Sequence, residues 1–444
     1  MTVTSIHIGM DDIDSPRGGC TTHFASLIVQ KLSSLGADWQ DYPNLIRLNP
    51  NIPFRTRGNG AVAIRFEIDG GEVENVLSIL ERMIQDYVEM DYSNTNPGVV
   101  LVQGKVPQDV DIFSQRAMWR TIPIDVGERV VERNDIQHIK WGNGRGLVGA
   151  LSAVGNPLDD DHTYEFIAYR SVDSISQPRG VHKESVIEMD KQMSDSLFSN
   201  VDERTGRVLI VPHGPDPVLY GIRGEQPESV KRASSKVESD QKVDRWMIFR
   251  TNQGTGAHLR NCVYVNDLRA YMAVVVHGIV DKKPRIFEGG HVLFGIGDCS
   301  GRADCAAYEP SGEFREVVGS LVEGDQVMVQ AGVRPASRTH GLTLNVEGLD
   351  VLKLAETFNV INPLCPHCLK RMKSAGKDKG YKCFNCGFKD PKAKRTETPV
   401  KRKLRETVYL PPPRAQRHLT RPLVRMNRRN QGVPDRLIAE WHRP

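Results

Sequence analysis

The chain has 444 residues, of which 39% are hydrophobic and 26% charged, as in ordinary globular proteins of about three domains, or four if one is small. No apolar run reaches the length of a membrane helix and no basic-then-apolar signal pattern opens the chain, so we expect a cytoplasmic protein with no membrane partner. The net charge of +4 is uneven, because residues 391–444 carry 15 Lys and Arg against four Asp and Glu. This basic tail predicts a polyanionic partner, with a solvated tail that has no target as the alternative.

The first predicted elements surround an acidic turn. Apolar residues alternate over 6–10 and predict a strand, which runs into the carboxylates of Asp11, Asp12 and Asp14. A predicted helix over 20–34 follows and opens with Thr21 and Thr22. Carboxylates suit Mg²⁺, which binds nucleotide phosphates, and a helix N-terminus with hydroxyls suits an anion. A solvated turn is the alternative, but adjacent like charges favour a metal–nucleotide site.

The next elements complete a unit of four strands and two helices. Residues 45–48, 59–68 and 99–102 are predicted strands, and 72–88 is a predicted helix, giving the βαββαβ order of a ferredoxin-like unit.

A loop between two of these strands carries candidate phosphate-binding groups. Arg55 and Arg57 project from one side of an extended segment, and Gly58 and Asn59 follow. Together with the acidic turn they predict an ATP site, and an exposed turn with incidental arginines is the alternative.

The middle of the chain is less regular. Residues 109–120 and 182–198 are predicted helices, and 163–170 and 208–211 are predicted strands. The glycine-rich stretch 141–150 does not match dinucleotide-binding spacing, and we interpret the acidic residues 159–161 as a solvated loop.

Two loops in this region carry candidate substrate-binding groups. The Pro- and Gly-rich path over 212–225 presents Asp216 and Arg223, and the loop over 250–259 presents His258. The polar composition of 225–243 predicts an exposed helix or a linker, and we expect 226–268 to be a linker and connecting segment.

Short strands with one helix then predict an OB-fold barrel over 269–355, a fold that commonly holds tRNA or single-stranded nucleic acid. A purely structural β-barrel is the alternative. Beyond it, Cys365, Cys368, Cys383 and Cys386 form two Cys-x-x-Cys pairs with 14 residues between them. This spacing predicts a closed, structural Zn²⁺ site in a ribbon over 360–392, followed by the basic tail 393–444.

With these pieces placed, the chain resembles the archaeal tRNA-isoleucine 2-agmatinylcytidine synthetase (TiaS) family. The resemblance covers roughly residues 4–390, and it rests on four motifs: Asp11-Asp12-x-Asp14-Ser15 with Cys20-Thr21-Thr22, the run 46–61, the loop 94–98, and Gly214-Pro-Asp216-Pro217. The chain departs from the family at Ile13, where members usually have Thr, and at Gly19, which is often Met.

The resemblance implies a multidomain α+β protein: a kinase-like catalytic domain and a ferredoxin-like domain within residues 1–225, then an OB-fold barrel and a zinc ribbon. The implied reaction is ATP-dependent attachment of agmatine to C2 of the wobble cytidine of tRNA-isoleucine, through a phosphorylated base, which changes decoding from AUG to AUA. Thr21 would be autophosphorylated. No obligate protein partner is evident.

The site residues follow from these motifs. We expect Mg²⁺ on Asp11, Asp12 and Asp14, and Zn²⁺ on the four cysteines. ATP would contact Arg55, Arg57, Gly58, Asn59 and Thr22, and the substrate candidates are Asp216, Arg223 and His258. Two other functions stay open: a different ATP-dependent tRNA base-modifying enzyme, and a non-catalytic OB-fold and zinc-ribbon factor that binds nucleic acid.

Overall fold

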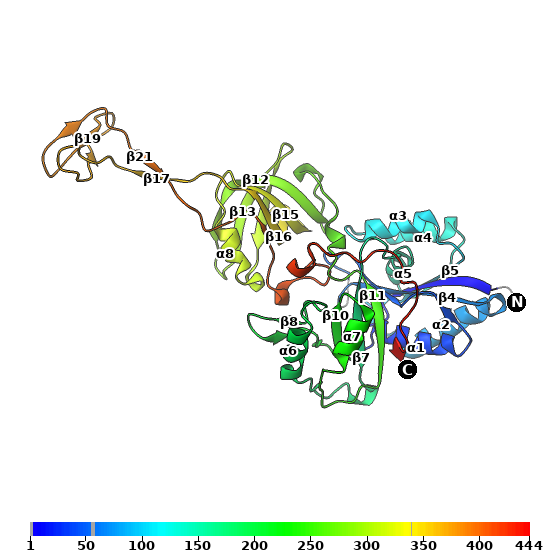
Figure 1. Ribbon diagram of the computed structural model, residues 1–444. Helices are drawn as coiled ribbons and strands as arrows, with labels where there is room; N and C mark the ends of the chain where they lie inside the picture. The colour runs from blue at the N-terminus through cyan, green and yellow to red at the C-terminus, as the bar shows by residue number, and fades with distance from the viewer. Residues whose placement is uncertain (1–2, 55–57, 339) are drawn as a thin grey trace.

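The computed structural model describes residues 3–54, 58–338 and 340–444. The predicted Arg55 and Arg57 lie outside this described part of the chain. The protein is a multidomain α+β structure, in which a large sheet with helices, a smaller barrel and a small outlying ribbon follow one another along the chain (Figure 1). None of the helices in the described part combines the length and apolar composition needed to cross a bilayer.

A ten-stranded sheet forms the larger body, in the order β10-β7-β11-β3-β4-β1-β5-β6, with β2 beside β4 and β23 beside β11. Its strands are β1 (Val3–Asp11), β2 (Asp38–Trp39), β3 (Asn44–Arg47), β4 (Gly60–Asp69), β5 (Gly98–Gln103), β6 (Gln137–Lys140), β7 (Thr163–Tyr169), β10 (Val218–Gly224), β11 (Arg245–Thr251) and β23 (His442–Arg443). The pairing of β3 with β11 is parallel and joins the two halves of the sheet. The strands and helices predicted within residues 6–102 are all present.

Helices cover both faces of this sheet. The alternating apolar side chains of β1 face α1 (Thr21–Ser33) and α2 (Val73–Tyr87) in one core. The opposite face packs against α3 (Gln108–Ala117), α4 (Ile124–Arg133) and α5 (Gly146–Val154). Helix α5 approaches β1 so closely that a Cβ atom on Gly9 would lie 2.0 Å from the carbonyl oxygen of Ala150. A glycine at this position is therefore required for the packing.

The prediction of a linker over 226–268 is wrong. This segment supplies α7 (Pro227–Ser234), which packs on β7 and β10, and then β11, which lies between β7 and β3 in the sheet. Its charged residues suggested solvent exposure, but Arg250 is buried and forms an ion pair with buried Asp41 at 2.6 Å. Because the charge of Arg250 is paired inside the protein, the sequence of β11 contains charged residues although the strand lies in the middle of the sheet.

Residues 182–211 are also less regular than predicted. The helix is α6 (Lys183–Gln192), shorter than expected, and the strand over 208–211 shrinks to β9 (Arg207–Val208), paired with β8 (Val201–Asp202).

The second body is a closed barrel. Its strands are β12 (Ala273–Ile286), β13 (Val292–Gly297), β14 (Arg302–Ala307), β15 (Gln326–Arg334) and β16 (Thr343–Lys353), with α8 (Phe314–Gly319) between β14 and β15. Antiparallel pairings link β14, β13, β12, β15 and β16 in that spatial order, and a parallel pairing of β14 with β16 closes the sheet around an apolar core.

The ribbon stands away from both bodies on a two-stranded stalk of β17 (Phe358–Ile361) and β21 (Thr396–Pro399) (Figure 1). Its own sheet consists of β18 (Lys373–Ser374), β19 (Tyr381–Lys382) and β20 (Lys389–Asp390).

The basic C-terminal tail is not a solvated tail, because it packs back on the rest of the chain. It adds β22 (Val408–Tyr409) to the barrel and β23 to the large sheet, ending near α1 (Figure 1). Along the way its arginines pair with carboxylates of both bodies: Arg402 with Asp325, Arg414 with Asp202 and Glu313, Arg417 with Glu347, and Arg421 and Arg425 with Asp161. These ion pairs involve five of the 15 Lys and Arg residues that predicted a polyanionic ligand.

Candidate active site

The acidic turn starts where β1 ends. Asp12 adopts a left-handed backbone conformation (φ 59°), and its carboxylate accepts a hydrogen bond from the backbone N–H of Asn96 at 2.9 Å. Ile13 is buried in the core with α1 and α2. The turn therefore separates the side chains, so that Asp11, Asp12 and Asp14 line a cavity while Ile13 packs inside. At position 13 this chain uses an apolar packing residue and not a hydroxyl beside the carboxylates.

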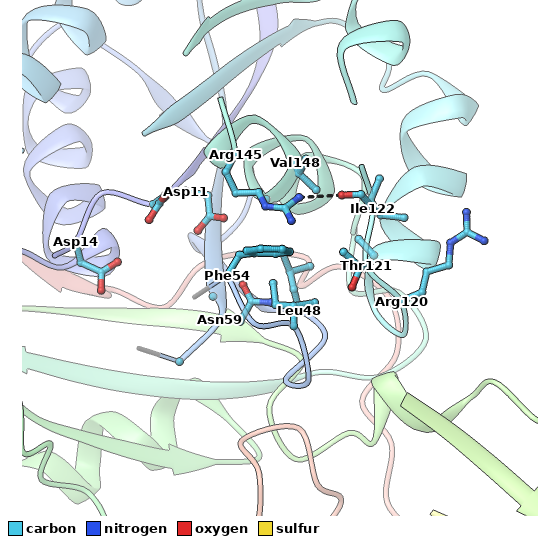
Figure 2. Close-up of a pocket in the computed structure, with 16 residues that line it drawn as sticks. Asp11, Asp14, Leu48, Phe54, Asn59, Arg120, Thr121, Ile122, Arg145 and Val148 are labelled. Atoms are coloured by element: carbon cyan, nitrogen blue, oxygen red, sulfur yellow. Dashed lines mark hydrogen bonds between the residues drawn. The ribbon is translucent and has the colours of Figure 1, made fainter. Parts of the chain in front are cut away.

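We call this hollow the acidic cavity (Figure 2). Phe54, Asn59 and Thr121 line it from other loops, and Arg145 lies over the ring of Phe54 with its guanidinium carbon 4.4 Å from the ring centre. Arg145 also donates a hydrogen bond to the carbonyl oxygen of Ile122 at 2.9 Å. The cavity thus combines carboxylates, an aromatic face and a fixed cation, a set suited to a metal-bound nucleotide.

The carboxylates destabilise one another's charge. Burial, followed by repulsion from Asp12, raises the pKa of Asp11 well above its ordinary value. Burial raises the pKa of Asp12 to about 6, although its hydrogen bond from Asn96 lowers it. Groups with pKa values raised in this way favour a bound cation. Gly149 makes room for them, because a Cβ atom there would lie 1.7 Å from a carboxylate oxygen of Asp11.

A second hollow, the threonine cavity, has a volume of about 280 Å³ and adjoins the first through the shared lining residues Asp14, Gly58 and Gly60. Thr21 and Thr22 lie in the first turn of α1 and line it. Because the first N–H groups of a helix have no partner within the helix, this end of α1 suits an anion. The sequence predicted one site at the acidic turn, and the structure has two adjacent cavities there, which share lining residues.

Two of the three predicted substrate residues lie in the threonine cavity. Asp216 lines it and forms an ion pair with Arg179 at 3.1 Å. Arg223 also lines it, 3.5 Å from the carboxylate of Glu165. Gly58 lines both cavities and Asn59 the acidic cavity.

The third predicted substrate residue, His258, is not at the site, and this prediction is wrong. It lies in a 3-10 turn (Ala257–Leu259), fully buried, and its Nε2 atom is 3.0 Å from the carboxylate of Glu347 on the barrel strand β16. Burial by itself would raise the pKa of Glu347. The hydrogen bond from His258 and its charge outweigh this effect, so the pKa of Glu347 lies below its ordinary value. His258 therefore joins the sheet body to the barrel.

The sequence reasoning missed several lining residues: Arg47, Phe54, Arg145, Glu165 and His418. Arg145 lies in the glycine-rich stretch 141–150. Although this stretch does not match dinucleotide-binding spacing, its glycines were a signal that could have located Arg145 at the site. Arg47 and Phe54 lie in the motif run 46–61, which was therefore also an available signal, whereas nothing in the local sequence of Glu165 and His418 marks them.

The four predicted metal-ligating cysteines converge in the ribbon. All four Sγ atoms lie within 4.8 Å of one another. The pairs Cys365–Cys386 and Cys368–Cys383 have Sγ–Sγ distances of 3.4 Å. Tetrahedral Zn²⁺ with Zn–S bonds of about 2.3 Å places sulfurs about 3.8 Å apart, so this set fits a zinc ion with little adjustment.

Comparisons with known proteins agree along the whole chain. Family models described as the TiaS TCKD domain, the TiaS FLD domain and the TiaS C-terminal zinc ribbon domain match residues 7–76, 144–258 and 362–404. A tRNA-isoleucine 2-agmatinylcytidine synthetase TiaS from Staphylothermus marinus is 40% identical over 447 residues, which cover 98% of this chain and 97% of that protein.

Solved structures give the same result. The crystal structure of TiaS in complex with an isoleucine tRNA and ATP is similar with a TM-score of 0.87 and 36% identity, and covers 97% of this chain and 99% of that one. A crystal structure of TiaS with an isoleucine tRNA, AMPCPP and agmatine is similar with a TM-score of 0.84 and 35% identity, and covers 97% of this chain and 99% of that one. At this coverage the similarity runs past residue 390 into the C-terminal segment.

Proposed function

The chain belongs to the TiaS family, and we propose on this basis that it attaches agmatine to C2 of the wobble cytidine of tRNA-isoleucine at the expense of ATP. The modification would change decoding from AUG to AUA. The observation that carries the proposal is the pair of adjacent cavities, one with carboxylates and the other with Thr21, which share Asp14 and Gly58 in their linings.

The chemistry requires an activated base. The C2 carbonyl of cytosine is a poor electrophile, because its oxygen is a poor leaving group. When a phosphoryl group is transferred to that oxygen, the primary amine of agmatine can form the N–C2 bond while the C2–O bond breaks and releases phosphate. The target base must leave its stack to reach such a site.

We assign the acidic cavity to ATP and Mg²⁺. Asp11, Asp12 and Asp14 would hold the ion, whose charge would neutralise phosphate oxygens. Arg145 lies in this cavity, and Arg55 and Arg57 precede Gly58 in the chain, so these arginines are the candidate phosphate clamps.

We assign the threonine cavity to the acceptor substrates. Thr21 is the candidate for autophosphorylation, and Thr22 lies beside it as a further phosphate contact. Agmatine carries two positive charges, so its pocket should contain carboxylates, and Glu165 and Asp216 are the candidates there. Arg223 would contact the tRNA or its phosphorylated base.

The domain assignment is also a proposal. The spatial order β3-β4-β1-β5 supports a ferredoxin-like unit built into the catalytic region, which contains the kinase-like part and extends to β11. The closed order β12-β13-β14-β16-β15 with a helix before β15 supports an OB-fold over 269–355. The zinc ribbon follows at 360–392. Because the proposed substrate is a tRNA, we expect the protein to act in the cytoplasm.

The function is tested by ATP-dependent transfer of labelled agmatine to a transcript of the isoleucine tRNA that carries the wobble cytidine. A transcript with uridine at the wobble position is the matched control, and we expect it to remain unlabelled. ATP turnover that requires neither tRNA nor agmatine, together with an unaffected Thr21→Ala variant, would contradict the proposal.

The acidic cavity predicts a pH-dependent response to Mg²⁺. An acid whose pKa is higher in the folded than in the unfolded state binds its proton more tightly when folded, so its contribution to stability is lost as pH rises. For Asp12, with a pKa of about 6, this loss falls between about pH 4 and 6 and amounts to about 1–3 kcal/mol without metal. Mg²⁺ should therefore raise Tm more at pH 7 than at pH 5.

The measurement is Tm against pH, with and without saturating Mg²⁺, for the wild type and for Asp12→Asn. The variant should show a smaller Mg²⁺ response and a smaller loss of stability between about pH 4 and 6. Identical Mg²⁺ responses in the two proteins would exclude Asp12 as a ligand.

We propose one Zn²⁺ ion on the four cysteines. Because the ribbon has a small apolar core around Met372, the metal should contribute much of its folding free energy. Elemental analysis should find about one equivalent of zinc per chain. Cys383→Ser should lose the metal and make residues 363–390 susceptible to proteolysis, while Cys262→Ser, at an exposed cysteine outside the ribbon, serves as the control. A metal-free ribbon that stays protected would refute the assignment.

A further inference from the structure

The C-terminal segment passes directly beside the threonine cavity. The backbone N–H groups of Gly254 and Gly256 donate hydrogen bonds to the carbonyl oxygens of His418 and Leu419, at 2.9 Å and 2.7 Å. The side chain of Leu419 is buried in the core that α3, α4 and α5 form with the sheet. The main chain at residue 418 is therefore held against the loop that follows the central strand β11.

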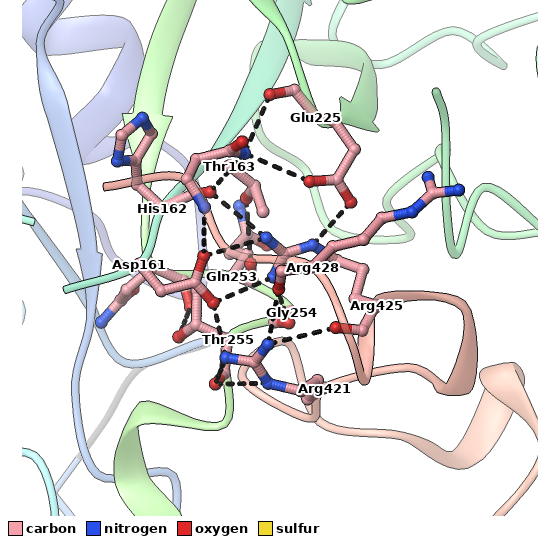
Figure 3. Close-up of polar contacts among 12 residues, drawn as sticks. Asp161, His162, Thr163, Glu225, Gln253, Gly254, Thr255, Arg421, Arg425 and Arg428 are labelled. Carbon is pink, nitrogen blue, oxygen red and sulfur yellow. Dashed lines mark hydrogen bonds and ion pairs between the residues drawn. The ribbon is translucent and has the colours of Figure 1, made fainter. Parts of the chain in front are cut away.

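Immediately beyond it, a group that we call the arginine clamp holds the segment in place. The clamp consists of Arg421, Arg425, Asp161 and Glu225 (Figure 3). Arg425 is fully buried, with its guanidinium 3.0 Å from Asp161 and 2.6 Å from Glu225. Arg421 contacts the same Asp161 at 2.5 Å and donates to the carbonyl oxygen of Thr255 at 2.9 Å.

Asp161 was expected in a solvated loop, and that expectation is wrong. Its carboxylate is buried and accepts hydrogen bonds from both arginines and from the backbone N–H of Asn430. A buried carboxylate in a loop is stable only with such partners. The clamp therefore ties the loop before β7 and the end of β10 to the C-terminal segment.

With the main chain fixed, the exposed imidazole of His418 lines the threonine cavity together with Thr21 and Arg223. A Cβ atom on Gly58 would lie 3.6 Å from its Nε2 atom and 3.2 Å from a guanidinium nitrogen of Arg47. Two nitrogen-bearing side chains, from β3 and from the C-terminal segment, thus converge at Gly58. Carboxylates line the same cavity at Glu165 and Asp216. Converging N–H donors are what a phosphoryl oxygen requires.

We propose that His418 is a further substrate-contacting residue, which donates a hydrogen bond to a phosphoryl oxygen of the substrate beside Thr21. Arg421 and Arg425 are the positioning residues that hold it there. The proposal rests on the function proposed above, and it makes the segment beyond the ribbon a part of the active site.

The first experiment compares the full-length wild type, His418→Ala and His418→Gln in agmatine transfer to the isoleucine tRNA. Loss of a donor to a developing negative charge lowers kcat by about 100-fold or more, so we expect that loss in His418→Ala, with the KM for agmatine and the Tm unchanged. His418→Gln retains an N–H donor and should recover activity to within about tenfold of the wild type. Arg429→Ala, at an exposed arginine of the same segment, is the control for charge and should behave as the wild type.

The second experiment tests positioning. If Arg421 acts through His418, Arg421→Ala should lower kcat. The double variant that combines Arg421→Ala with His418→Ala should then have the same kcat as His418→Ala alone. Arg421→Lys provides the same comparison should Arg421→Ala fail to fold.

Each outcome separates the hypotheses. A wild type that transfers no agmatine contradicts the proposed function itself. If the wild type is active and His418→Ala is equally active, His418 has no role in the reaction. The same conclusion follows if His418→Ala loses activity only in proportion to a lower Tm. Additive losses in the double variant overturn the positioning role of Arg421.

Discussion

Thr21→Ala is expected to lose ATP-dependent agmatine transfer by about 10³-fold or more while the protein remains folded. Thr21 lies in the first turn of α1 and lines the same cavity as Asp14, and its hydroxyl is the proposed acceptor of a phosphoryl group. Alanine has high helix propensity and removes the acceptor without adding bulk, so the loss should appear in kcat. The measurement is single-turnover transfer with labelled agmatine, together with labelling of the protein by γ-labelled ATP.

The matched control is Thr21→Ser, which keeps the hydroxyl and removes one methyl group. It should retain both protein labelling and most of the transfer rate. Equal transfer rates in Thr21→Ala and the wild type would remove Thr21 from the mechanism, even if other parts of the proposed function survived.

Arg425→Met should produce the largest loss of stability among single substitutions in the C-terminal segment. Methionine fills similar volume but leaves the buried carboxylate of Glu225 without its arginine partner, whereas Asp161 keeps its ion pair with Arg421. Breaking a buried ion pair by removing one partner costs about 3–5 kcal/mol. In a domain of this size the cost corresponds to a Tm lower by about 5–15 °C, measured by thermal denaturation.

Two further variants test the cause. Arg429→Met changes the same charge at an exposed position and should shift Tm little. Glu225→Gln combined with Arg425→Met should lose less than the sum of the single losses, because the double variant removes the carboxylate that Arg425→Met leaves without its arginine. A Tm for Arg425→Met equal to that of Arg429→Met would mean that the clamp contributes no stability.

The parts of the fold that were predictable from sequence are those with a strong local pattern. Alternation in residues 6–10, the helix over 72–88 and the two Cys-x-x-Cys pairs each depend on neighbours in sequence, and all are present as expected. The carboxylates of the acidic turn line a cavity, and their role in binding a metal stays a prediction.

The misses share one physical cause, which is that charged residues were assigned to solvent. The charge of Arg250 made β11 look like part of a linker, and Asp161 was placed in a solvated loop. For 391–444, with 15 Lys and Arg, the alternative of a solvated tail is wrong, because the segment packs on the rest of the chain. Composition cannot distinguish a solvated charge from one that is paired inside, because the partner lies far away along the chain.

By itself the sequence determined the family motifs, the position of the acidic turn with Thr21 after it, and the metal-ligating cysteines, because spacing along the chain is enough for each. Only the tertiary structure decided that two adjacent cavities lie at this turn and that Arg145 lines one of them and His418 the other. The tertiary structure also places His258 away from the site, within hydrogen-bonding distance of Glu347. These outcomes depend on which distant segments pack together, and that is set by buried area and by pairing of charges across the whole fold.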